Sequence, residues 1–89
     1  MPNKSAKIKA VITIVDTKEV TEHTFPDVNE FMETTLMNVA ASSIVLGREL
    51  KSTPPELVGD HLSWRFMYAD TGEVYMTIEA DRLVDRHLH

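Results

Sequence analysis

Residues 61–80 read HLSWRFMYADTGEVYMTIEA, and this stretch decides the predicted fold. Large apolar residues alternate with others on both sides of Asp70-Thr71-Gly72, and a period of two is typical of β-strands. A turn over Asp70-Thr71, with Gly72 at positive φ, closes a hairpin through a three-residue loop. The loop pairs Tyr68 with Val74, Phe66 with Met76, Trp64 with Ile78 and Leu62 with Ala80. The large apolar side chains then share one face of a sheet.

A second hairpin is predicted near the start of the chain. Residues 7–15 alternate, with Ile8, Ala10, Ile12 and Ile14 on one face, and residues 20–25 follow after a polar break. A two-residue loop at Thr17-Lys18 pairs Ile14 with Thr21, Ile12 with His23 and Ala10 with Phe25. A three-residue loop would bury Glu22 opposite Ile12 instead. We favour the first register, because a buried unpaired carboxylate costs more than a buried neutral imidazole.

Between the hairpins, apolar residues recur at helical spacing. The positions Val28, Met32, Leu36, Val39, Ser43 and Leu46 predict a helix over about 28–46. Asp27 suits the N-cap, with Glu30 three positions later, and Gly47 suits the C-terminal stop. The segment LMNVAASSIVL (36–46) is apolar or small on nearly every side, which is typical of a helix covered on more than one face.

The order hairpin, helix, hairpin predicts an α+β fold, ββαββ, with a four-stranded sheet and the long helix packed on one face. Over Lys7–Ala80 this order resembles the β-grasp fold, whose first and last strands lie parallel at the centre of the sheet. The alternative is an antiparallel meander with the helix behind it. In both, Ser52–Asp60 is expected to be a connection holding one short turn.

Length and composition set the outer limits. Eighty-nine residues and 10.1 kDa leave room for one domain, with a frayed N-terminus at 1–6, a core at 7–80 and a tail or short helix at 81–89. The chain has no cysteine, which excludes disulfides and thiolate sites. A net charge of −5 argues against direct nucleic-acid binding. With no apolar run of membrane-spanning length and no signal peptide, we expect a cytoplasmic protein.

Apolar residues also occupy positions that point away from the predicted core. On the sheet these are Val11, Val15, Val20, Met67 and Tyr75. On the helix, a second apolar side lies around Met37, Ala41 and Ile44. Exposed apolar surface of this kind is typically covered by another chain, so we expect a homodimer or a complex with another protein.

Acidic residues gather in one stretch of sequence. Between Glu19 and Gly47 there are five acids and no Lys or Arg: Glu19, Glu22, Asp27, Glu30 and Glu33. One interpretation is a solvated surface that supports the helix. The other is an acidic surface that docks on a basic partner or imitates DNA phosphates, as small proteins of phages and mobile elements do.

Two patterns could carry chemistry. Asp70-Thr71-Gly72 matches the triplet of aspartic proteases, but only 17 residues follow it and a hairpin turn explains it by position. His87 and His89, with Asp81 and Asp85, could gather zinc or nickel, although a chain end seldom preorganises ligands. We expect no cofactor and no enzymatic activity, because the chain offers no set of nucleophile, base and orienting group.

The function predicted from the sequence is a small, non-enzymatic protein–protein interaction module that acts as a homodimer. The alternative is an acidic inhibitor that blocks a nucleic-acid-binding protein by occupying its basic groove. Salt should distinguish the two, because only the second depends on charge.

Overall fold

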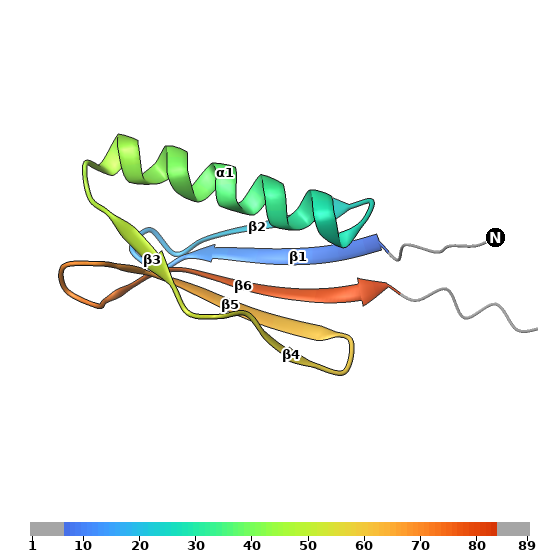
Figure 1. The fold of residues 1–89 in the computed structure, drawn as a ribbon. Helices are drawn as coiled ribbons and strands as arrows, with labels where there is room; N and C mark the ends of the chain where they lie inside the picture. The colour runs from blue at the N-terminus through green and yellow to red at the C-terminus, as the bar shows by residue number, and fades with distance from the viewer. Residues whose placement is uncertain (1–6, 84–89) are drawn as a thin grey trace, which may run out of the picture.

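The computed structural model describes residues 7–83 and has one helix packed on an antiparallel sheet (Figure 1). The elements are β1 (Lys7–Ile14), β2 (Glu19–Phe25), α1 (Val28–Leu46), β3 (Leu50–Ser52), β4 (Glu56–Val58), β5 (His61–Tyr68) and β6 (Val74–Leu83). The α+β class and the helix bounds are confirmed. The expected four strands are wrong, because the sheet has six. Residues 81–83 extend β6, whereas the rest of the expected tail and the expected frayed N-terminus lie outside the described residues.

The two hairpins meet at the centre of the sheet through β1 and β6. The strand order is β2-β1-β6-β5-β3, with β4 also paired to β5. β1 and β6 are antiparallel, and Ile12 lies opposite Ile78. The resemblance to the β-grasp fold predicted a parallel pair of strands at the centre of the sheet. That prediction is wrong, because the central strands β1 and β6 are antiparallel.

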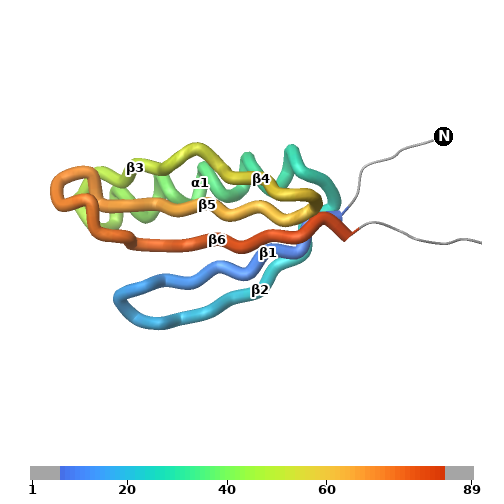
Figure 2. Tube along the Cα trace, turned by 90° about the horizontal axis from the view of Figure 1, so that it is seen from below, coloured from blue at the N-terminus to red at the C-terminus, as the bar shows by residue number. Residues whose placement is uncertain are grey.

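The direction of β6 follows from the segment between the helix and β5. Figure 2 shows β3 and β4 running along the outer edge of β5. Both pair with β5 in antiparallel fashion, so the segment expected to be a connection is an edge strand interrupted at Thr53-Pro54-Pro55. Because β3 and β4 together run along the sheet from the end of the helix, β5 starts at the far end of the sheet from that point. As a result β6 is antiparallel to β1. Proline suits the edge, where its missing N–H faces no neighbouring strand.

The first hairpin has the predicted faces but a different register. Ile14 pairs with Glu19, Ile12 with Thr21 and Ala10 with His23, so the loop is four residues long and not two. The shift is two residues, which keeps every side chain on its predicted face. His23 is nevertheless exposed; it lies on the edge strand β2, in the lining of a pocket to which α1 also contributes.

The second hairpin keeps most of the predicted register. Phe66 pairs with Met76, Trp64 with Ile78 and Leu62 with Ala80, as expected. The predicted pair of Tyr68 and Val74 is wrong, since a bulge sets Val74 opposite Met67. Gly72 has φ +79° and donates its N–H to the carbonyl of Tyr68 at 2.8 Å, which confirms its role in the turn.

Helix and sheet meet through aromatic side chains. Phe31 is 1% exposed and is the main anchor of the helix, with its ring 5.4 Å from Phe25 and 6.2 Å from Trp64 between centroids. Around it the buried cluster comprises Ile8, Ala10, Trp64, Phe66, Met76, Ile78 and Ala80. Asp27 caps the helix by accepting the N–H of Glu30 at Oδ1, at 2.9 Å. Gly47 ends it in the left-handed conformation.

Candidate protein interface

A strongly exposed apolar surface lies on the helix. Ile44 and Val45 are the most exposed large apolar residues in 7–83, at 81% and 85%, and Met37 is 71% exposed. Leu36 is half exposed, and Ala40 and Ala41 lie between these residues on the surface. We call the six residues 36, 37, 40, 41, 44 and 45 the outer helix face.

The helix exposes this face because it packs on the sheet along one narrow line. Within α1 only Phe31 and Thr35 are buried. Residues 37, 40 and 44 are spaced by three and four, so they follow one stripe on the opposite side. In the part of the chain that the structure describes, no other segment lies over the far side of α1 (Figure 1).

The outer helix face is also free of charge along its length. Glu33 is the last ionisable residue before Arg48, so residues 34–47 carry none. A surface helix normally sets charged residues opposite its buried stripe. This helix does so only in its first turns, at Glu30 and Glu33, and its second half has no charged residue.

The apolar residues predicted on the outer sheet face are separated from one another. Val11 is half-buried between Glu22 and Glu79, its neighbours on the two adjacent strands. Tyr75 packs against the core, with its ring 5.5 Å from that of Tyr68. Val15 lies in the β1–β2 loop. Val20 and Met67 lie on β2 and β5, with β1 and β6 between them.

Polar side chains gather on the outer sheet face instead. His61 Nε2 lies 2.6 Å from Oε1 of Glu79, and its Nδ1 lies 2.8 Å from Oδ1 of Asp81. The hydrogen bond to Asp81, and then that to Glu79, raises the pKa of His61. Ser63 donates its hydroxyl to Glu79 at 2.9 Å. Since both ring nitrogens face carboxylates and Ser63 bonds to Glu79, this geometry is not that of a base activating a serine.

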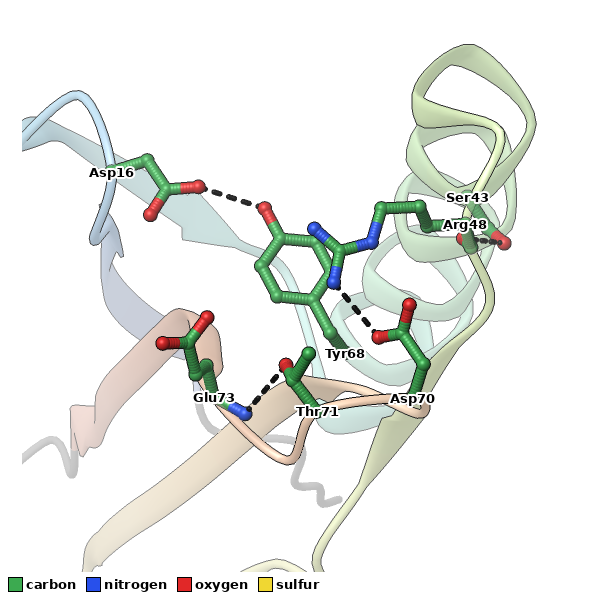
Figure 3. A network of polar contacts seen from close by, with 7 residues as sticks. All are labelled: Asp16, Ser43, Arg48, Tyr68, Asp70, Thr71 and Glu73. Carbon is green, nitrogen blue, oxygen red and sulfur yellow. Dashed lines mark hydrogen bonds and ion pairs between the residues drawn. The ribbon is translucent and has the colours of Figure 1, made fainter.

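At the other end of the sheet, a polar network surrounds Tyr68 (Figure 3). Arg48 Nη2 donates to Oδ1 of Asp70 at 2.8 Å, and the Tyr68 hydroxyl donates to Oδ2 of Asp16 at 2.7 Å. Ser43 donates its hydroxyl to the carbonyl of Arg48 at 2.7 Å. The network ties the helix end to the β1–β2 loop and the β5–β6 turn.

The same network bears on the protease hypothesis. The hydrogen bond from Arg48 lowers the pKa of Asp70, so this carboxylate is ionised at neutral pH. A protease aspartate must instead share a proton with a second carboxylate. Asp70 therefore belongs to the turn and to the ion pair with Arg48.

The acidic residues of the alternative hypothesis lie on several surfaces. Glu22 is on the outer sheet face, 3.2 Å from Nζ of Lys9, and Asp27 is engaged as the helix cap. Glu19 pairs with Ile14 and so points to the helix side of the sheet. Glu30 and Glu33 are exposed on α1. Two of the five are therefore already engaged within the chain.

A depression of about 310 Å³ opens beside the start of the helix. Its lining includes the apolar residues Ile8, Phe31 and Leu62 and the charged residues Asp60 and Arg82. The Arg82 guanidinium donates to Asp60 through Nε at 3.0 Å and Nη2 at 2.6 Å, so these two charges are directed at each other and not at a ligand.

Within residues 7–83, no group of three or more His, Asp and Glu side chains is placed to hold a metal ion. His87 and His89, the expected metal ligands, lie outside the described residues, as does Asp85. Among the described residues, no helix is both long and apolar enough to cross a bilayer.

Comparison of the chain with protein-family models, with curated proteins and with solved structures finds no match. The candidate site therefore rests on the geometry of this molecule alone. Sequence reasoning had already pointed to Met37, Ala41 and Ile44, and all three are exposed. It missed the His61 cluster, although a register that pairs Leu62 with Ala80 also sets His61 opposite Asp81.

Proposed function

We propose that this chain is a small protein–protein interaction module that docks through the outer helix face. The observation that carries the proposal is the exposure of Met37, Ile44 and Val45 on a stretch of helix without charge. Contiguous apolar surface on a small protein is typical of an interaction site.

The magnitudes support a docking role. Fully burying one large apolar side chain is worth about 1.5–3 kcal/mol. The four large residues Leu36, Met37, Ile44 and Val45 could thus offset much of the cost of association, which is about 4–15 kcal/mol. The outer sheet face offers less, since Val11 lies between two carboxylates and Tyr75 packs on the core.

Affinity capture from the cells that make the protein tests this function. The wild-type chain is compared with the double variant Met37→Lys, Ile44→Lys and with the control Thr24→Lys, which adds a charge to exposed β2. We expect a partner, including untagged copies of the chain, to be retained by the wild type and the control and lost from the double variant. Equal retention by the double variant would overturn the proposal.

Ionic strength separates this function from that of an acidic inhibitor. An apolar interface should hold its partner when the salt concentration rises from about 0.1 M to about 1 M. Over this range the Debye length falls from about 10 Å to about 3 Å, which weakens interactions between charges and not apolar contacts. Release of the partner over this range would favour the acidic alternative. Circular dichroism of each variant ensures that a loss of binding is not a loss of fold.

A further inference from the structure

We infer that the partner of the outer helix face is a second copy of this chain, with the two α1 helices antiparallel and crossing at Ala40-Ala41. The inference rests on the proposed function, since it names the partner of the same surface. Its starting point is the order of residues along the face, which is close to symmetric about Ala40-Ala41.

The symmetry of the face suits pairing with itself. Leu36 and Met37 lie on one side of Ala40-Ala41, and Ile44 and Val45 lie at the same spacing on the other side. A two-fold axis through this point sets Met37 of one copy opposite Ile44 of its partner. Small side chains at the crossing point let the two backbones approach, while the larger pairs fill the space on each side.

Charge selects the antiparallel arrangement. Glu30 and Glu33 are exposed in the first turns of α1, while the nearest basic residue, Arg48, follows the last turn. Parallel helices would set the glutamates of both copies about 8–10 Å apart. In the antiparallel pair, the two Glu33 residues are about 22 Å apart at 1.5 Å rise per residue, well beyond the Debye length. Each Glu33 then lies near the end of the partner's helix that is followed by Arg48.

The size of the face indicates a dimer that dissociates on dilution. A helix of 19 residues is about 28 Å long and about 10 Å across. Two such surfaces total about 560 Å², below the roughly 1,200–2,000 Å² of stable specific interfaces, so the dimer is a weak and transient one. Cross-linking is therefore a better test than chromatography, because a covalent bond traps a complex that is only partly populated.

The absence of cysteine from the chain makes the test clean. Met37→Cys and Ile44→Cys are prepared separately, one of them isotopically labelled, and oxidised mildly alone and mixed. Asn29→Cys, exposed near the helix start, is the control for random collision. We expect the mixture to give mostly disulfide-linked dimers with one copy of each variant, above the half that random pairing would give. Each variant alone should give several-fold less.

Other outcomes overturn the inference in different ways. Dimers of Met37→Cys with itself would indicate parallel helices. Cross-linking no greater than that of Asn29→Cys would show that the face does not bind its own copy. If affinity capture still finds a partner that requires Met37 and Ile44, the docking function stands and only the identity of the partner fails. If capture also shows no dependence on these residues, both fail.

Discussion

The guanidinium of Arg48 lies over the ring of Tyr68, with Cζ 3.7 Å from the ring centroid. The same group binds Asp70, while the Tyr68 hydroxyl binds Asp16. The Asp70 hydrogen bond raises the pKa of Arg48, and the Asp16 hydrogen bond raises that of Tyr68. Since these residues come from four segments of the chain, their contacts hold the helix end and both loops in place.

Replacing Arg48 with lysine should lower the melting temperature even though the charge is kept. A planar guanidinium can cover the ring and bind the carboxylate together, whereas an ammonium group has no such geometry. Thermal denaturation followed by circular dichroism measures the change. The control is Arg65→Lys, on an exposed side chain of β5, and equal losses at the two positions would contradict the role given to Arg48.

Replacing Phe31 with alanine should destabilise the fold by about 3–5 kcal/mol, because it empties the site where the helix is anchored. Urea denaturation measures the loss. Should that loss unfold the domain, Phe31→Leu is the milder variant, with an expected cost of up to about 1.5 kcal/mol. Asn38→Ala, on an exposed part of the same helix, should stay within about 0.5 kcal/mol. A small effect at Phe31 would mean that the helix is held elsewhere.

The His61 cluster predicts a pH-dependent contribution to stability. The pKa of His61 is raised in the folded state, so its protonated form favours folding. This contribution is complete below the unfolded value of about 6.5 and is lost as pH rises through the higher folded value. The stability gap between wild type and His61→Gln should therefore be widest near pH 5.5 and shrink toward alkaline pH. Urea titrations at several pH values measure it, and a constant gap would exclude the mechanism.

The fold was predictable where a long periodic pattern and a turn residue agree. Gly72 and the rows of apolar residues around it indicated the β5–β6 register, which the structure follows from Leu62 to Phe66. The bulge beyond Phe66 leaves no signal in the pattern, and it turns Tyr75 toward Tyr68. The expected outer-face position of Tyr75 depended on unbroken alternation past this point.

The strand direction was missed for a different reason. β3 and β4 have three residues each and are separated by Thr53-Pro54-Pro55, so neither is long enough to show a period. Once they are counted as one pass along the edge, the antiparallel pairing of β1 with β6 follows. A side chain of β5 also binds the segment between β3 and β4: Trp64 Nε1 donates to the Thr53 carbonyl at 3.0 Å.

The candidate interface was visible in part. The uncharged second half of the helix is a property of the sequence, and it indicated a surface around Met37 and Ile44. No local sequence pattern shows how much of the helix the sheet covers. In the structure the surface around Met37 and Ile44 is exposed, because the buried residues of α1, Phe31 and Thr35, lie on the opposite side of the helix.

The loop between β1 and β2 holds one residue in a strained backbone conformation. Lys18 has φ +61°, the left-handed region that costs a residue with a side chain about 1–2 kcal/mol. Lys18→Gly removes this strain from the folded state, but glycine also increases the conformational entropy of the unfolded chain, which offsets part of the effect. We therefore expect the free energy of unfolding to rise by about 0.5–1 kcal/mol. Thr17→Gly is the matched control and should lose stability, because Thr17 Oγ1 accepts the N–H of Glu19 at 3.3 Å. Urea denaturation of both variants decides the matter, and destabilisation by Lys18→Gly would show that the four-residue loop is not the one formed in solution.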